Sequence, residues 1–219
     1  MTTSADSFLG ILAVLASGAV TALHVGAGAF GMALVLGFLL AVTVTFVKSR
    51  AIGLAVAAYI EWMRNVPALA HLFLLYFGLA SFGLRFSPKT AAIIGLGMVG
   101  AAVLCDVFAA GLKAIHAGQR EAALSVGLTP SQAMRFVLMP QMLRLTLPSL
   151  GNYASQLIKD TSIASAIAAP EVMFYARNLV TSTFQTTLIY VAAMVLYALM
   201  LLPISWFFAR LEARLESTR

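Results

Sequence analysis

Charge is scarce in this sequence. Asp, Glu, Lys and Arg make up only 10% of its 219 residues, whereas 61% of the residues are hydrophobic and the mean hydropathy is +0.95. Soluble domains carry charge on about a quarter of their residues. The composition therefore excludes an ordinary soluble domain and favours a protein that lies in a membrane.

Cysteine pairs, metal-ligand clusters and catalytic sets are also missing. Cys105 is the only cysteine, so no disulfide framework can form. The three histidines, His24, His71 and His116, are too widely spaced to suggest a metal site. We expect His71 to be a hydrogen-bonded residue within a helix. Because no set of side chains suggests catalysis, we expect no catalytic residue, no metal and no enzymatic activity in this chain.

A nucleotide-binding loop is absent as well. The phosphate-binding pattern G-x-x-x-x-G-K-[S/T] does not occur. The pattern G-x-G-x-x-G occurs twice, at residues 26–31 and 95–100, but each copy lies inside an apolar run and follows no strand. We interpret both as small-residue contacts that let helices approach closely. Any nucleotide must then be bound by another chain.

Long apolar runs are what the sequence does have. A spanning helix needs about 20 mostly apolar residues, and five runs predict an all-α integral membrane protein with five transmembrane helices. These runs are residues 22–47, 66–83, 90–112, 149–169 and 187–208. The run 8–19 is too short to span, so we expect an interfacial helix within an N-terminal segment 1–21. Residues 22–209 then form a single transmembrane domain, and 210–219 form a cytoplasmic tail.

The basic residues predict an orientation. Residues 1–7 contain no Lys or Arg, so they lack the cationic start of a secretory signal. With five spans and the C-terminus inside, ten of the 14 basic residues fall on the cytoplasmic side. This bias predicts an outside N-terminus and a cytoplasmic C-terminus. We attribute the net charge of +6 to this topology and to contact with anionic lipid, not to nucleic-acid binding.

Two polar segments interrupt the runs. Residues 48–65 predict a short interfacial helix with Glu61 and Arg64 on one face. Residues 113–147 are the only polar stretch large enough for a docking surface. Within them the pattern predicts a helix that stops at Gly127, and a second helix with Thr129 as its N-cap, Pro130 at its first position and Gln132 completing a capping box. We expect Pro140 to end that second helix.

The ordered residues of this loop carry a resemblance. Glu121, Ala122, Ala123, Gly127 and Pro140, with their spacing, resemble the Glu-Ala-Ala loop of permease subunits of binding-protein-dependent ABC importers. The segments 59–67, 76–79, 116–123 and 147–163 are similar to the polar amino acid uptake subfamily. The similarity covers roughly residues 22–215.

The resemblance implies a fold, a location and partners. The fold is the type I (MetI-like) importer permease fold, with cytoplasmic coupling helices, in the bacterial cytoplasmic membrane. The expected partners are an ATPase dimer that binds ATP and Mg, a second permease subunit that is identical or homologous, and an extracytoplasmic solute-binding protein. In such permeases the loop lies in a groove of the ATPase, where Glu121 can pair with a cation. The alternative is a solvated connector in which Glu121 pairs with Arg120 or Lys113.

Polar residues inside the spans are candidates for the substrate path, because charge in hydrocarbon is expensive. They are Asp106, Lys159, Asp160, Thr161 and Ser162. Adjacent helical residues point about 100° apart, so Lys159 and Asp160 cannot face the same way. One of them can face the path while the other pairs within the bundle. Thr161 and Ser162 can instead bond backbone carbonyls or neighbouring helices.

Departures from the subfamily pattern bear on the solute. Ala109 and Ala110 stand where that pattern commonly has a polar pair, and Leu188 stands where it often has an acid. We therefore expect import of a polar amino acid or a related small polar solute, such as an opine or amino acid derivative. The chain either handles a solute other than a basic amino acid or is half of a heteromeric pair. An ion-driven secondary carrier and a non-transporting membrane scaffold are the rival hypotheses.

Overall fold

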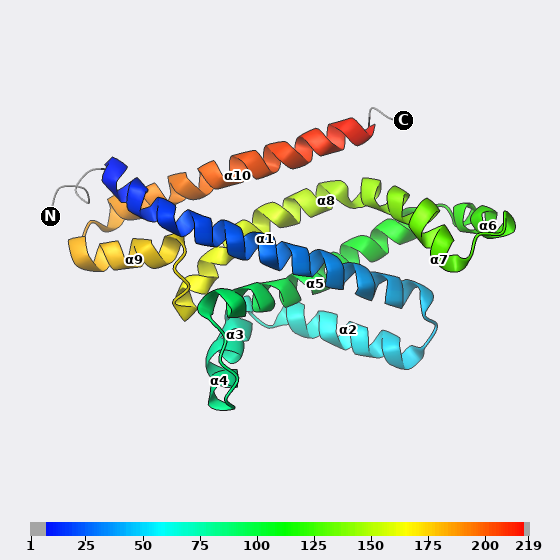
Figure 1. Ribbon diagram of the computed structural model, residues 1–219, viewed down its shortest axis with the longest axis horizontal. Helices are drawn as coiled ribbons and strands as arrows, with labels where there is room; N and C mark the ends of the chain where they lie inside the picture. The colour runs from blue at the N-terminus through cyan, green and yellow to red at the C-terminus, as the bar shows by residue number, and fades with distance from the viewer. Residues whose placement is uncertain (1–7, 217–219) are drawn as a thin grey trace.

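The computed structural model describes residues 8–216, and all regular structure in this part of the chain is helical. Four long helices lie along the long axis of the molecule (Figure 1). They are α1 (Phe8–Phe46), α5 (Pro88–Ala114), α8 (Met139–Asp160) and α10 (Thr186–Glu216). The prediction of an all-α fold is confirmed for the described residues.

Shorter elements connect these four helices. Between α1 and α5 lie α2 (Arg50–Asn65), α3 (Ala68–Phe73), the π-helical η1 (Leu74–Gly78) and α4 (Leu79–Ser81). Between α5 and α8 lie α6 (Ala117–Ser125), α7 (Pro130–Ala133) and the π-helical η2 (Met134–Leu138). Between α8 and α10 lie the 3₁₀-helical η3 (Thr161–Ile167) and α9 (Val172–Thr183).

The centre of the molecule is the packing of α1 against α5. A Cβ on Gly37 of α1 would lie 2.9 Å from Leu104 Cβ, and one on Gly97 of α5 would lie 2.8 Å from Met32 Sδ. Glycine therefore lets the two backbones approach, as expected where helices associate by close packing in lipid. Both G-x-G-x-x-G patterns contribute such contacts, which confirms their interpretation, except that Gly31 faces open space.

The first helix corrects one expectation. We expected a separate short helix over residues 8–19, but α1 runs without interruption from Phe8 to Phe46. Ile11 and Leu15 are fully buried and pack in one cluster with residues of α9 and α10 such as Val172. A criterion based on the length of an apolar run ignores this tertiary packing. The interfacial location of the segment stays a prediction, and residues 1–7 lie outside the described residues.

The second and fourth predicted spans differ from the structure. The helical residues of the second, 68–81, are long and apolar enough to cross a membrane only when they are taken together with α2. Among the described residues, α1, α5 and α10 are long and apolar enough to cross a membrane, and α2 with α3–α4 would be a fourth span bent by 102°. The predicted helix 149–169 is wrong, because α8 ends at Asp160 and η3 follows it up to Ala168, which has a φ of 60°. The count of five spans stays a prediction.

Candidate functional site

One face of the second half of α8 is polar. Ser149, Asn152, Gln156 and Lys159 are all exposed and recur at helical spacing, so they form a single stripe. We call these four residues the α8 stripe. The opposite face, which includes Leu150 and Leu157, is buried in the bundle. Polar groups facing hydrocarbon are costly, so the stripe must border water or protein.

An ion pair lies near the Ser149 end of this stripe. Arg64 Nη1 on α2 donates to Asp106 Oδ2 on α5 at 2.6 Å, and each side chain is about half exposed, at 54% and 49%. Asp106 lines a hollow of about 500 Å³ together with Ala110, Thr146 and Ser149. The structure therefore brings a predicted path residue of α5 next to the α8 stripe.

Arg64 is a site residue that sequence reasoning missed. We expected it to lie at the membrane surface beside Glu61, but Glu61 instead accepts a hydrogen bond from Asn65 Nδ2 at 2.8 Å. The helix α2 packs on α5, where Tyr59 Oη also donates to the Met98 carbonyl at 2.6 Å. Neither contact has a signal in the sequence, because each joins residues about 40 positions apart.

The second group of predicted path residues lies at the end of α8. Lys159 is exposed, and Asp160 accepts a hydrogen bond from Gln156 Nε2 at 2.9 Å. Asp160 is thus bonded to a residue of the α8 stripe on its own helix. Thr161 is fully buried and its Oγ1 donates to the Ile158 carbonyl at 2.6 Å, so its placement favours the alternative of a bond to the backbone. The carbonyl of Ser162 accepts from Ser165 Oγ at 2.7 Å.

The loop 113–147 has the predicted helix–turn–helix form. The first helix, α6, is capped by His116, whose Nδ1 accepts from the Gly118 amide at 3.1 Å. Gly127 follows α6 with a φ of 85°, a conformation that glycine adopts at little cost. Thr129 and Gln132 then form the predicted capping box at the start of α7.

Pro140 does not end the second helix. The π-helical η2 follows α7 directly, and Pro140 stands in the first turn of α8, which continues to Asp160. A proline is tolerated in the first turn of a helix, because the backbone N–H that it lacks would have no acceptor within that helix. In the wider π turn the Met139 amide donates to the Met134 carbonyl. This turn accommodates the proline ring, so α7, η2 and α8 follow one another without a break.

The tip of the loop presents a mixed surface. Ala123 is buried, whereas Glu121 and Ala122 are exposed. Two large apolar side chains are also exposed, Val126 at 78% and Phe136 at 62%. Within residues 8–216 the Glu121 carboxylate makes no hydrogen bond or ion pair. In the described part of the chain Glu121 therefore does not pair with Arg120 or Lys113, as the alternative of a solvated connector had predicted.

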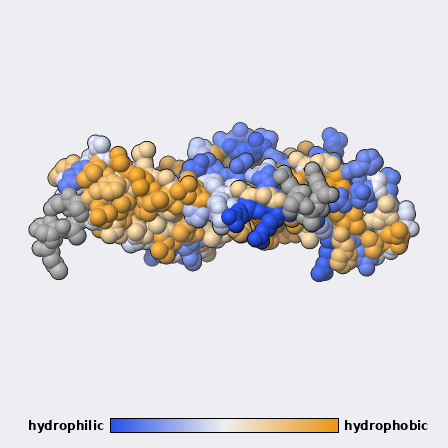
Figure 2. All heavy atoms as spheres, turned by 90° about the horizontal axis from the view of Figure 1, so that it is seen from above, coloured by the Kyte–Doolittle hydropathy of each residue, from blue (hydrophilic) through white to orange (hydrophobic). Residues whose placement is uncertain are grey.

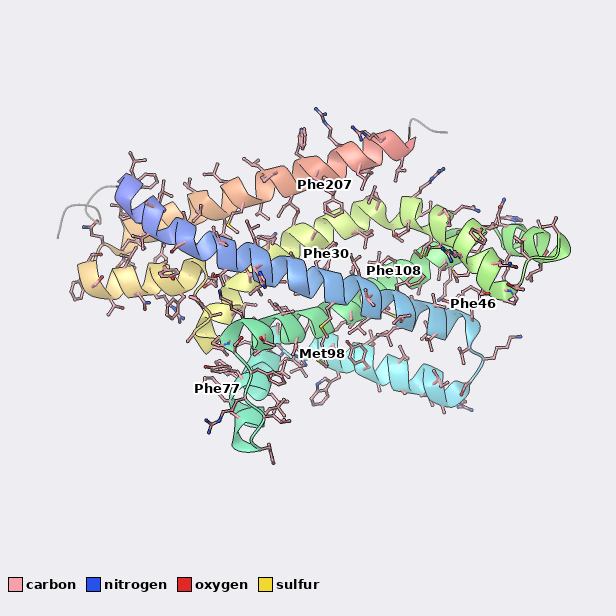
Figure 3. All side chains as sticks on the ribbon, in the orientation of Figure 1. Phe30, Phe46, Phe77, Met98, Phe108 and Phe207 are labelled. Carbon is pink, nitrogen blue, oxygen red and sulfur yellow. The ribbon has the colours of Figure 1, made fainter. Side chains whose placement is uncertain are left out.

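The base of the loop contacts the long helices α1 and α8 and lies near α5. The Arg120 guanidinium lies 5.2 Å from the centroid of the Phe46 ring at the end of α1 (labelled in Figure 3). Gln119 Oε1 accepts from Gln141 Nε2 of α8 at 3.2 Å. Leu112 of α5 lines the same hollow as Phe46 and Arg120. The helix α6 thus contacts α1 and α8 and borders the same hollow as α5.

A buried acid lies at the opposite end of the molecule. Glu171 caps α9 by accepting from the Met173 and Phe174 amides at 2.9 and 2.8 Å, and it also accepts from Tyr197 Oη of α10 at 2.7 Å. Burial raises the pKa of the Glu171 carboxyl, and these hydrogen bonds oppose the rise. Glutamate is not a favoured N-cap, so the sequence contains no signal for this role.

The prediction for His71 is confirmed for its place in a helix and wrong for its hydrogen bond. This side chain is buried, and within the described part of the chain neither of its ring nitrogens has a hydrogen-bond partner. It lies on α3, which packs against α5 and η3. No group of three or more His, Cys, Asp and Glu side chains suited to a metal ion lies among residues 8–216.

Known proteins resemble this chain over most of its length. Residues 33–217 match the family described as binding-protein-dependent transport system inner membrane component. The chain is 35% identical over 161 residues to the probable glutamine ABC transporter permease protein GlnM of Bacillus subtilis, covering 74% of each chain. It is 32% identical over 160 residues to the glutamine transport system permease protein GlnP of Escherichia coli, covering 72% of this chain and 73% of that one.

Solved structures agree. A crystal structure of an amino acid ABC transporter with histidines superposes with a TM-score of 0.85 at 29% identity, over 98% of this chain and all of the other. An inward-facing MetNI methionine ABC transporter superposes with a TM-score of 0.74 at 22% identity and shares the fold. With the sequence match extending over residues 33–217, the chain belongs to the family of inner membrane components of binding-protein-dependent transport systems, the non-enzymatic permease subunits of ABC importers.

Proposed function

We propose that this chain is half of the permease of an ATP-driven importer that moves a polar amino acid, or a similar small polar solute, into the cell. The Arg64–Asp106 pair beside the α8 stripe carries this proposal. It is a half-exposed pair of opposite charges next to a hollow in a bundle of membrane-length helices. The similar proteins named as glutamine permeases support the same class of solute.

The pair suits a zwitterion. A guanidinium binds a carboxylate through two parallel hydrogen bonds, and a carboxylate accepts from an ammonium group. The carboxylate of an amino acid that enters the hollow can therefore pair with Arg64, and its ammonium group can pair with Asp106. Neither side chain is then left unpaired. Lys159 and Asp160 at the outer end of the stripe are the proposed earlier contacts along the same path. Ser162 is partly exposed beside them.

A second permease subunit completes the path in this proposal. The α8 stripe and Asp106 lie on the surface of the single chain, and a matching surface of another subunit would enclose them. The partner is identical or homologous. Ala110, where the subfamily commonly has a polar residue, lines the hollow beside Asp106. The shortage of polar groups there supports either a solute that is not a basic amino acid or a heteromeric pair.

Energy comes from the ATPase through the loop. We infer that Glu121, Ala122, Ala123, Gly127 and Pro140 belong to a coupling segment that docks on the ATP- and Mg-binding subunit. Exposed Val126 and Phe136 supply apolar contact area beside the Glu121 carboxylate. The fastening of α6 to α1 and α8 then converts closure of the ATPases into a change in the packing of the spans. Five spans, an outside N-terminus and a cytoplasmic C-terminus are part of this proposal.

Reconstitution tests the proposal directly. The complex co-purified with this chain is placed in proteoliposomes with its solute-binding protein, and uptake of labelled polar amino acids is followed. We expect uptake only when ATP is present on the side of the loop. Uptake without an ATPase subunit would support the secondary carrier instead, and ATPase binding without any solute movement would support the scaffold. Mass measurement of the complex separates two copies of this chain from a heteromeric pair.

A further inference from the structure

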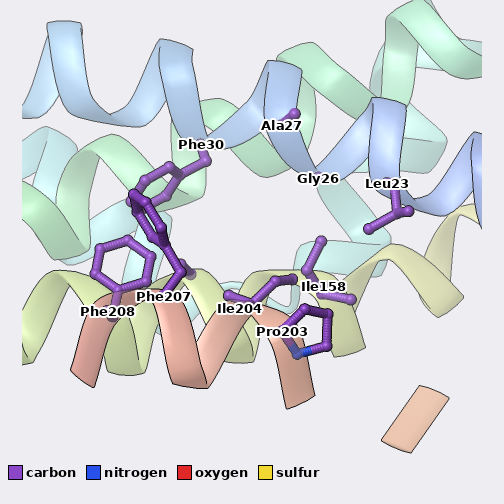
Figure 4. Close-up of a pocket in the computed structure, with 10 residues that line it drawn as sticks. Leu23, Gly26, Ala27, Phe30, Ile158, Pro203, Ile204, Phe207 and Phe208 are labelled. Carbon is purple, nitrogen blue, oxygen red and sulfur yellow. The ribbon is translucent and has the colours of Figure 1, made fainter. Parts of the chain in front are cut away.

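An apolar groove lies on the side of the bundle away from the Arg64–Asp106 pair. It has a volume of about 400 Å³ and lies between α1, α8 and α10. Leu23, Ala27 and Phe30 of α1 form one wall, Ile158 of α8 contributes to the floor, and Pro203 and Phe207 of α10 form the other wall (Figure 4). Every lining side chain is apolar, so the groove suits hydrocarbon.

An aromatic cluster marks the end of the groove nearer the C-terminus. The rings of Phe30 and Phe208 meet edge to face with centroids 6.3 Å apart, and Phe207 packs on Phe208 at 5.5 Å. The Phe207 ring remains 56% exposed. An elongated apolar ligand can therefore leave the groove over Phe207 along the surface of α10.

Two cations follow on the same stripe of α10. Pro203, Phe207, Arg210 and Arg214 lie within about 60° of one another around the helix, because their spacings are four, three and four residues. Arg210 is exposed, and its guanidinium lies 4.4 Å from the centroid of the Trp206 ring. Glu212, the nearby acid, points to the opposite side of the helix. Arg210 and Arg214 line a second hollow that begins at Trp206.

Along α10 these features change from apolar to aromatic to cationic, which matches an amphiphile with an apolar tail and an anionic head. The groove, lined by Pro203, comes first, the exposed Phe207 ring follows, and Arg210 comes about 10 Å beyond Pro203 along the helix. Tryptophan and arginine are the side chains that hold the boundary between hydrocarbon and water. Figure 2 shows the same change on the surface, where hydrophobic atoms cover one end and hydrophilic atoms gather near the C-terminal end of α10.

We propose that the groove between α1, α8 and α10 holds one acyl chain of an anionic glycerophospholipid whose phosphate is bound by Arg210. Charge complementarity decides between lipids, because a zwitterionic headgroup offers the cations less net attraction than an anionic one. The proposal concerns a surface separate from the proposed solute path. It stands whether or not the solute is an amino acid.

Native mass spectrometry of the purified complex tests the proposal. The complex is incubated with equal amounts of phosphatidylglycerol and phosphatidylethanolamine, and the lipid retained by this chain is counted. We expect one phosphatidylglycerol to be retained preferentially. Arg210→Gln should lower its retention by about fivefold, the effect of one cation near a lipid surface. Ala27→Phe, which fills the groove from α1, should lower the retention of both lipids.

Matched variants guard against general effects. Lys48→Gln removes an exposed cation near the end of α1, and Val35→Phe adds a ring at an exposed position of α1 outside the groove. Both should retain phosphatidylglycerol as the unmodified chain does. Equal loss in Arg210→Gln and Lys48→Gln, or equal retention of the two lipids by the unmodified chain, would overturn the proposal. So would cross-linking of the Ala27→Cys variant to another subunit through its new side chain, because a protein would then cover the groove.

Discussion

Arg64 and Asp106 join α2 to α5 through a 2.6 Å contact between Nη1 and Oδ2, and both side chains remain about half exposed. Exposed ion pairs contribute little to stability, roughly 0 to 1 kcal/mol. The pair therefore costs the fold little when it opens. A solute with two charges can compete for it.

Neutralising either member of the pair should impair transport more than stability. Asp106→Asn and Arg64→Gln are each expected to lower ATP-driven uptake by about tenfold or more, the value of one charge-assisted hydrogen bond. Thermal unfolding should shift little, as for an exposed pair. Lys89→Gln, at an exposed position of α5, is the matched control. Full uptake by both variants would remove the pair from the path.

Truncating the acid of the loop should uncouple the two subunits. Glu121→Ala is expected to lower uptake and ATPase co-purification by about tenfold or more, because the cation of the ATPase loses its partner. Ser131→Ala, an exposed position of the same loop, should have no effect. Unchanged uptake in Glu121→Ala would support the scaffold hypothesis.

The turn between α6 and α7 should tolerate only glycine well. Gly127 has a φ of 85°, so Gly127→Ala is expected to destabilise the loop by roughly 1 kcal/mol. Hydrogen exchange of residues 124–133 should become faster. Gly53→Ala is the opposite control, since Gly53 lies in α2 with open space around it and alanine there should stabilise the helix. Identical exchange in both variants would contradict the role of the turn.

The close approach of α1 and α5 should not admit a larger side chain. Gly37→Leu is expected to destabilise the bundle by about 1 to 3 kcal/mol, because Leu104 leaves no room for added atoms. Gly31→Leu, where a Cβ meets nothing within 4 Å, should be nearly neutral. Unfolding in detergent measures both. A similar loss of stability in the two variants would contradict this prediction, because the cost would then not come from the contact with Leu104.

The buried acid should give the fold a specific pH dependence. Burial raises the pKa of Glu171, so the folded chain binds this proton more tightly than the unfolded chain does. Its contribution to stability is thus fully present below the unfolded pKa of about 4.3 and is lost as pH rises through the higher folded value. Relative to Glu171→Gln, the unmodified chain should lose melting temperature as pH rises. A difference in melting temperature that does not change with pH would contradict this.

Local chemistry was readable from the sequence. The capping box of Thr129 and Gln132, the turn at Gly127 and the apolar runs of α1, α5 and α10 depend on neighbours within a few residues, so their pattern is written along the chain. The helix–turn–helix form of residues 117–133 was readable for the same reason. Composition alone indicated the membrane, because charge density decides which solvent a chain can enter.

Tertiary contacts decided the rest. Only the fold brings Arg64 to Asp106 and Tyr197 to Glu171, since each pair is separated by 26 or more positions in the sequence. The π turn that carries the helix past Pro140 and the packing that extends α1 back to Phe8 are likewise settled by neighbouring elements. Sequence patterns report which groups a helix face holds. Which residues of other helices contact those groups depends on three-dimensional packing.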